Sequence, residues 1–290
     1  MLKQRSVSAV AVVLVAAIPA IIGGPVFVLV IAALGVLAGH ELVRAFAHAE
    51  AQPYAAITLV APLAFVVFAG IQPSLADAGA LTVAVVLLSL AAGVLFADPH
   101  LAATNWALTT ASALYVGLPL AHFVALRQLA GGSTRGWVSH LAAAVGSGGT
   151  ARGLAWFALA LAATWLTDTG AYLVGRAFGR AKLAPKISPG KTIVGSIAGV
   201  LAGTLAGAAA APLFGVPIPA YAGAAIGFVL AVVGQVGDLG ESLIKRSLGL
   251  KDMGSLIPGH GGILDRIDAL LFTIPLAYWL ARLAQEVYRP

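Results

Sequence analysis

The chain has 290 residues, of which 60% are hydrophobic and only 10% are charged, whereas soluble domains average roughly 45–50% apolar and 25% charged residues. Together with a mean hydropathy of +0.97, this composition excludes a water-soluble globular protein. The formal net charge of +6 does not indicate nucleic-acid binding, because the basic residues lie between hydrophobic segments and not on one amphipathic face.

Hydrophobic segments of transmembrane length fill most of the chain, and a membrane-spanning helix needs about 20 apolar residues. The first segment follows a short charged leader and runs from Val7 to Ile22; it resembles a signal peptide, but further spans follow at once, so we expect an uncleaved helix. The others cover residues 25–46, 54–71, 78–97, 102–128, 153–175, 191–214, 217–240 and 262–286. We therefore predict an all-α, polytopic integral membrane protein with about nine transmembrane helices, and a short interfacial helix around Trp137 to Val145.

The basic loops predict how the chain is oriented. Residues 176–191 contain five Lys or Arg and no acid, and residues 245–251 contain three. The positive-inside rule places both loops in the cytoplasm, which puts the amino terminus inside and the carboxy terminus outside. Arg127, Arg135 and Arg152 lie in a loop on the opposite side and argue against this orientation.

Charged residues are distributed unequally along the chain. Residues 51–126 contain only Asp77 and Asp98, whereas residues 165–268 contain nine basic and six acidic side chains. No linker long enough to separate two soluble domains is visible. We predict that residues 1–150 form a transmembrane scaffold and that residues 151–290 form the catalytic region.

Four carboxylates lie in or beside apolar helices of this second region: Asp168, Asp238, Asp265 and Asp268. Each costs about 2.5–3.5 kcal/mol in a membrane helix, so the group needs cations or water for compensation. Asp265 and Asp268 are three residues apart, which places them on one face of the predicted last helix. Oxygen ligands without Cys or clustered His favour Mg²⁺. We predict that Asp238, Asp265 and Asp268 bind Mg²⁺, and whether a second cation binds stays open.

Each acid has a simpler interpretation as well, namely a helix-end salt bridge with Lys245, Arg246 or Arg266. Four acids beside seven or more cations in two loops favour a polyphosphate and metal site over four separate salt bridges.

Two loops carry the residues expected to bind phosphate. Gly261 and Gly262 precede the predicted last helix, whose uncapped N–H groups would form an anion site. His260 either donates to a phosphate oxygen or caps this helix. In the other loop, Ser188 and Lys191 are suited to phosphate contact, although a basic loop can also serve only to bind anionic lipid.

The segment from Ser242 to Asp268 resembles the signature of the phosphatidate cytidylyltransferase (CDP-diacylglycerol synthase) family, with each fixed position filled. Residues 235–242 and 168–176 are similar to the same family, so the resemblance covers about 165–270. The chain departs from the family pattern at Gly190 and Val194, where relatives carry Lys and Glu. If those two residues only pair with each other, restoring Val194→Glu alone should strand a charge and do harm.

The resemblance implies that the phosphate of phosphatidic acid attacks the α-phosphorus of CTP and that pyrophosphate leaves. It implies a multi-pass protein of the inner (cytoplasmic) membrane with its active site facing the cytoplasm. The expected catalytic residues are Asp238, Asp265, Asp268, Lys245 and Arg246, and the expected substrate-binding residues are Lys251, Asp252, His260, Gly261, Gly262, Arg266, Ser188, Lys191 and Asp168.

Two other functions are less consistent with the sequence. An ion-coupled transporter should show broken helices in two inverted halves, and a CDP-alcohol phosphotransferase should carry its own motif of spaced aspartates; neither is visible. The choice between CTP and dCTP, the acyl-chain preference and the formation of a homodimer are left open by the sequence.

Overall fold

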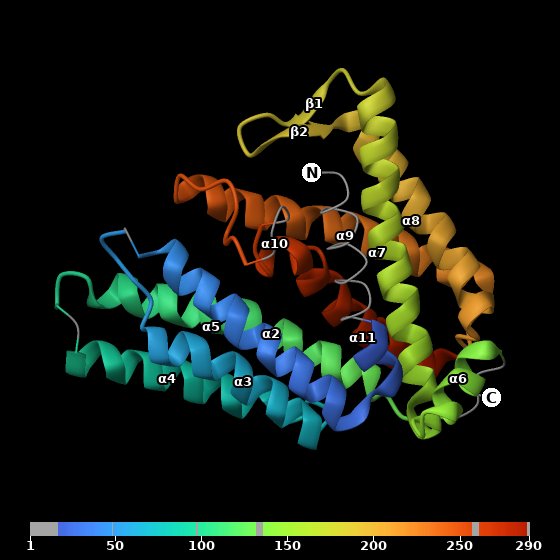
Figure 1. Cartoon of the computed structure of the whole chain (residues 1–290), viewed down its shortest axis with the longest axis horizontal. Coiled ribbons are helices and arrows are strands. Elements are labelled where there is room, and N and C mark those ends of the chain that lie inside the picture. The colour runs from blue at the N-terminus through green and yellow to red at the C-terminus, as the bar shows by residue number, and fades with distance from the viewer. Residues whose placement is uncertain (1–16, 48, 97, 132–135, 257–260, 289–290) are drawn as a thin grey trace. The chain divides into compact units, whose positions relative to one another are not determined.

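The computed structural model describes residues 17–47, 49–96, 98–131, 136–256 and 261–288. Apart from one small hairpin, the regular elements of this part of the chain are helices (Figure 1). The first half contains α2 (Gly24–Ala45), α3 (Ala55–Ile71), α4 (Ala78–Phe96), α5 (Ala102–Arg127) and α6 (Trp137–Ala144). The second half contains the short 3-10 helix η1 (Gly148–Thr150), α7 (Ala151–Phe178), β1 (Lys182–Ala184), β2 (Ser188–Thr192), α8 (Ile193–Phe214), α9 (Ala220–Ser247), α10 (Leu264–Ile267) and α11 (Leu270–Val287).

The predicted all-α membrane architecture is confirmed. Among the described residues, six helices are long and apolar enough to cross a membrane, namely α2, α4, α5, α7, α8 and α9. The apolar helix α3, with 17 residues, is slightly shorter. The predicted first helix lies mainly outside the described residues, so the predicted number of nine spans is not reached in the part described. The interfacial helix expected near Trp137 is present as α6.

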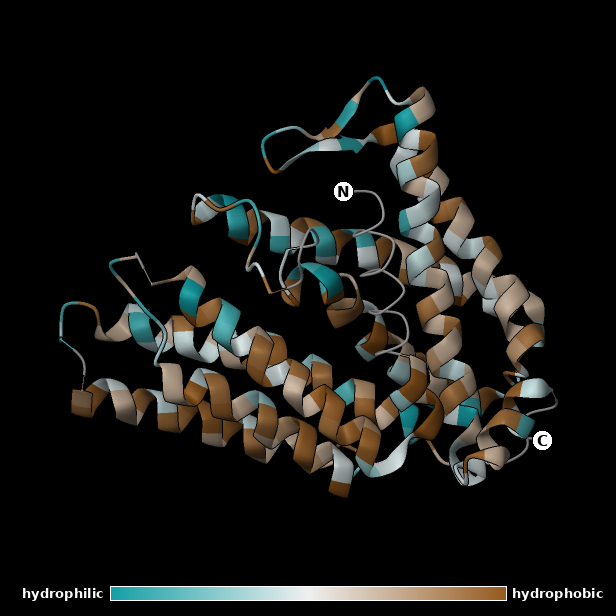
Figure 2. Ribbon diagram, in the orientation of Figure 1, coloured by the Kyte–Doolittle hydropathy of each residue, from teal (hydrophilic) through white to brown (hydrophobic). Residues whose placement is uncertain are grey.

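The long helices consist largely of apolar residues, as expected for contact with lipid (Figure 2). On α4, Leu87, Leu88 and Leu95 are 58%, 63% and 70% exposed. A soluble monomer rarely exposes so continuous an apolar surface, whereas lipid is a good solvent for it.

The chain divides into two compact units. The first unit comprises residues 1–125 and 247–267, and the second comprises 126–246 and 268–290. The units are therefore interleaved along the chain, and the family signature contributes residues to both. The functional division near residue 150 remains a prediction.

Glycines allow the helices of the second unit to pack closely. Gly195, Gly199, Gly203 and Gly207 form a ladder with a spacing of four residues on α8, which packs along α7. A Cβ atom on Gly195 would lie 2.7 Å from the Ala171 carbonyl oxygen, and one on Gly199 would lie 2.8 Å from that of Thr167. The ladder thus lets α7 and α8 approach closely, as small residues at this spacing do in membrane helices.

Gly207→Ala should lower the thermal unfolding midpoint of the purified protein. Its Cβ atom would lie 2.7 Å from the Gly227 Cα atom of α9, and crowding between backbones costs about 1–3 kcal/mol. Gly240→Ala is the matched control, because a Cβ atom there meets nothing within 4 Å. Equal midpoints for the two variants would contradict the role of the ladder.

Candidate active site

One face of α9 carries three charged groups of the second unit. Asp238, Glu241, Ser242 and Lys245 are spaced at i, i+3, i+4 and i+7, which places them on one side of a helix. Ser242 Oγ lies 3.5 Å from Asp238 Oδ1, and Lys245 Nζ lies 3.4 Å from Glu241 Oε1. We expected the helix to end near residue 240 and Lys245 and Arg246 to lie in a loop; this was wrong, because α9 continues to Ser247.

Lys191 of β2 forms an ion pair with this face. Its Nζ lies 2.6 Å from Asp238 Oδ2, and the two side chains are 26% and 30% exposed. The pair links the basic hairpin to α9, although the residues are far apart in the sequence. Both side chains are thus partly buried, and the Lys191 Nζ atom itself is buried.

Asp268 adds a further carboxylate to the second unit. It lies between α10 and α11, and it interacts with Glu241 through a side-chain hydrogen bond and with the charge of Lys245. Burial raises the pKa of the Asp268 carboxyl to about 6, and repulsion by Asp238 adds to this rise. A cation beside these carboxylates would oppose that repulsion.

Asp168 completes the carboxylate cluster, which we define as Asp168, Asp238 and Asp268. Asp168 projects from α7, and both other members repel it while Lys191 attracts it. Three acids and two lysines, Lys191 and Lys245, thus interact electrostatically within one unit. Such a mixture of charges is suited to binding a polyphosphate together with a cation.

The hairpin of β1 and β2 replaces the irregular loop expected there. Lys182 pairs with Thr192 and Ala184 with Ser188 in an antiparallel register. Arg246 Nε donates to the Ile187 carbonyl oxygen at 3.1 Å, which joins the tip of the hairpin to the end of α9. The Thr192 side chain accepts from Gly195 N at 3.2 Å and caps α8.

Val194 lies in the first turn of α8 and is 41% exposed. The expected harm from Val194→Glu alone therefore stays a prediction. The dipole of α8 would favour a carboxylate in its first turn. At Gly190, a Cβ atom would meet nothing within 4 Å.

The last helix is divided. We expected a continuous helix over 262–286 with Asp265 and Asp268 on one face, but α10 ends at Ile267 and α11 begins at Leu270. The two aspartates also belong to different compact units. Asp265 and Asp268 therefore do not share the face of one continuous helix, and a metal ion bound by both remains a prediction.

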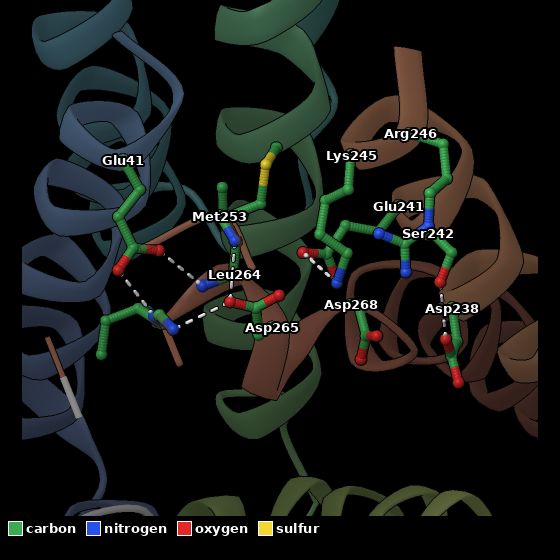
Figure 3. A network of polar contacts seen from close by, with 12 residues as sticks. Glu41, Asp238, Glu241, Ser242, Lys245, Arg246, Met253, Leu264, Asp265 and Asp268 are labelled. Carbon is green, nitrogen blue, oxygen red and sulfur yellow. Dashed lines mark hydrogen bonds and ion pairs between the residues drawn. The ribbon is translucent and has the colours of Figure 1, made fainter. Parts of the chain in front are cut away.

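In the first unit, the backbone before α10 is bound by carboxylates (Figure 3). Asp265 Oδ2 accepts from Gly262 N at 2.8 Å and from Met253 N at 3.0 Å. Glu41 Oε1 accepts from Ile263 N at 2.8 Å, and its Oε2 accepts from Leu264 N at 2.9 Å. The expectation of uncapped N–H groups at this helix start was wrong, because the protein's own acids occupy them.

The remaining predicted residues of the first unit lie near this point. Lys251, Asp252 and Arg266 are exposed, which leaves the charges of Lys251 and Arg266 accessible to a phosphate. Gly261 has a φ of 81°, which favours glycine. His260 lies outside the described residues.

The donor set fits Mg²⁺ only in part. Within the described ranges no group of three or more His, Cys, Asp or Glu is arranged to hold a metal ion. Mg²⁺ commonly uses one or two carboxylates and completes its shell with water and phosphate. The carboxylates of Asp238 and Asp268 are suited to such a partial shell.

Two buried acids near these residues were not predicted from the sequence. Glu241 is fully buried on α9, and Glu41 lies on α2, in the part assigned only to the scaffold. The signal for Glu41 was its position: a single acid in an apolar segment is costly and needs a partner.

Comparison with known proteins agrees with these features. A family model described as "Cytidylyltransferase family" matches residues 3–284. A phosphatidate cytidylyltransferase of Bacillus subtilis is 35% identical over 174 residues, which are 60% of this chain and 57% of that protein. Proteins of the same name from Synechocystis sp. and Staphylococcus saprophyticus are 41% identical over 129 residues and 42% identical over 124 residues.

These two alignments cover 44% and 43% of this chain and 44% and 48% of the respective relatives. The matched part of the chain thus spans about half the length of the curated relatives. The family model, in contrast, covers nearly all of the chain, including both compact units. The chain therefore belongs to the cytidylyltransferase family.

Proposed function

We propose that this protein is a phosphatidate cytidylyltransferase, which converts CTP and phosphatidic acid into CDP-diacylglycerol and pyrophosphate. The observation that carries the proposal is the carboxylate cluster with Lys191 and Lys245 inside an apolar helical unit. Family membership and the names of the relatives support the same reaction.

The reaction joins a phosphate oxygen of phosphatidic acid to the α-phosphorus of CTP. The bond between that phosphorus and the oxygen bridging to the β-phosphorus breaks, and pyrophosphate leaves with the electron pair. The attacking phosphate is already ionised, so the protein needs neither a nucleophile nor a strong general base. Its task is to position two anions and to offset their charge.

Lysine and arginine side chains are suited to this task. Lys191, Lys245 and Arg246 of the second unit would bind phosphate oxygens, and Ser188 of β2 would donate a hydrogen bond. Lys251 and Arg266 of the first unit carry exposed charges for the same purpose, with Asp252 and the Gly261–Gly262 backbone beside them in the sequence. His260 would either donate a hydrogen bond to a phosphate oxygen or cap the helix that follows it.

Mg²⁺ would be held by Asp238 and Asp268, with Asp265 as a further predicted ligand. When bound, the ion would neutralise charge on the reacting and leaving oxygens. Asp168 would repel a misplaced phosphate. It would also attract the Lys191 ammonium group and so keep it beside the carboxylate cluster.

The site would face the cytoplasm of a multi-pass protein in the inner membrane, where soluble CTP meets the lipid substrate. The two basic loops support this orientation. The hairpin and the connection before α7 lie at opposite ends of α7, whose 28 residues span about 42 Å at 1.5 Å per residue. CTP and bilayer phosphatidic acid are then the partners, and a homodimer remains open.

Single introduced cysteines test the orientation, because the chain has no cysteine. A membrane-impermeant maleimide should label Ala144→Cys, on an exposed position of α6, in intact cells. Ser188→Cys, on β2, should be labelled only after the membrane is permeabilised. The reverse pattern would contradict the proposed topology.

The activity itself is tested with purified protein in mixed micelles. Cytidine-labelled CTP, phosphatidic acid and Mg²⁺ should yield label in the lipid extract, and omission of phosphatidic acid or addition of EDTA should abolish it. Incorporation that does not depend on phosphatidic acid would contradict the proposed substrate, and incorporation unaffected by EDTA would contradict the proposed metal.

A further inference from the structure

Glu41 is a buried acid without a role in the proposed chemistry. It lies near the end of α2, and its side chain and backbone together are only 2% exposed. Burying a carboxylate is costly unless hydrogen bonds compensate for the lost water. Its two oxygens accept from the backbone N–H groups of Ile263 and Leu264, 222 and 223 residues away.

Two glycines leave room for this carboxylate. A Cβ atom on Gly254 would lie 2.5 Å from Glu41 Oε1, and one on Gly262 would lie 2.5 Å from Oε2 and 2.6 Å from Oε1. A side chain at either position would push the carboxylate from its place. The two glycines therefore match the Glu41 carboxylate in shape, while its hydrogen bonds come from Ile263 and Leu264.

Asp265, which is itself close in sequence to Ile263 and Leu264, also binds backbone N–H groups. It binds the N–H groups of Met253 and Gly262, so the two carboxylates together fix four backbone donors (Figure 3). Hydrogen bonds to a charged acceptor are about twice as strong as neutral ones. The described residues beside Lys251 and Arg266, two exposed cations, are thus held by carboxylates.

We propose that Glu41 is a positioning residue of the active site, which binds the backbone at the start of α10 and so holds the signature segment in its working conformation. Its effect on turnover rests on the proposed function, whereas its effect on the backbone does not. Glu41 touches no substrate in this account; it acts through the segment that carries Lys251 and Arg266.

Glu41→Gln is the direct test, since it keeps the size of the side chain but replaces one accepting oxygen by a donor. One N–H group then faces an NH₂ group, and the loss of a charge-assisted bond should speed amide exchange about tenfold or more in peptides covering 250–268. Exchange in α4 and α8 should not change. Glu50→Gln is the control, because Glu50 lies in the same unit and is exposed.

Kinetics separate positioning from a purely structural role. Glu41→Gln should raise the KM for CTP or phosphatidic acid, or lower kcat, by about tenfold in protein that is fully folded by its thermal transition. Faster local exchange with unchanged kcat and KM would contradict positioning, and unchanged local exchange would contradict the anchor. A wild-type protein without cytidylyl transfer would instead contradict the proposed function, so the two failures are distinguishable.

Gly254→Ala provides a second variant if Glu41→Gln does not fold. The added methyl group crowds Glu41 Oε1 without removing its charge, and exchange in the same peptides should again rise. Combining Gly254→Ala with Glu41→Ala removes the crowded atom, so the effects should be clearly less than additive. Full additivity would contradict the contact on which the proposal depends.

Discussion

Asp268→Asn should reduce cytidylyl transfer at least about 100-fold, the scale seen when one electrostatic stabiliser of a transition state is removed. Asparagine keeps the shape of the side chain but removes the charge expected to hold Mg²⁺. Repulsion by Asp238 and burial, which raise the pKa of Asp268, are relieved in the variant. The thermal unfolding midpoint should therefore stay equal or rise while activity falls.

Initial rates across a Mg²⁺ titration, together with thermal scans, measure both quantities. Glu286→Gln is the matched control, because Glu286 is an exposed acid of the same unit. Undiminished turnover in Asp268→Asn, and likewise in Asp265→Asn, would rule out the proposed metal ligands. A loss of activity that merely follows a loss of folded protein would contradict the electrostatic account.

Substitution of Lys191, which forms an ion pair with Asp238, should have the second large effect on activity. Lys191→Gln leaves Asp238 without the cation that lies 2.6 Å from it, and it removes a charge expected to bind phosphate. We expect kcat/KM for CTP to fall about 10- to 100-fold. Lys186→Gln, an exposed lysine in the turn of the same hairpin, should change it less than about threefold.

The charge-swapped double variant Lys191→Asp with Asp238→Lys separates structure from catalysis. It restores an ion pair at the same place, so thermal stability should recover relative to either single variant. Activity should not recover, because the carboxylate has moved off α9 and a lysine has entered the carboxylate cluster. Recovery of activity would show that the pair is only structural.

Hydropathy alone predicted most of the helices. The segments expected at 25–46, 54–71 and 78–97 agree with α2, α3 and α4 within one residue at either end. Membrane helices satisfy their own backbone hydrogen bonds, so a local apolar run is enough to specify them. The break between α10 and α11 had no such signal, because Asp268 and Ala269, which separate the two helices, include neither Gly nor Pro.

Contacts between distant residues were harder to predict. The sequence indicated that acids and cations of the second half act together, and Asp168 and Asp238 do interact with Lys191, while Asp268 interacts with Lys245. It gave no means of pairing Lys191 with Asp238, since several cations were equally suitable. Glu41 was missed because its partners are backbone N–H groups more than 200 residues away, and backbone groups leave no mark in side-chain composition.

The position of the bond that breaks in CTP tests the central claim most directly. In parallel reactions with phosphatidic acid and Mg²⁺, label from CTP carrying ³²P at the α-phosphate should enter the lipid extract, and label at the γ-phosphate should remain in water as pyrophosphate. Asp268→Asn should lose the first signal. Transfer of the γ-label into lipid, or an α-label that stays in water with wild-type protein, would contradict cytidylyl transfer by this protein.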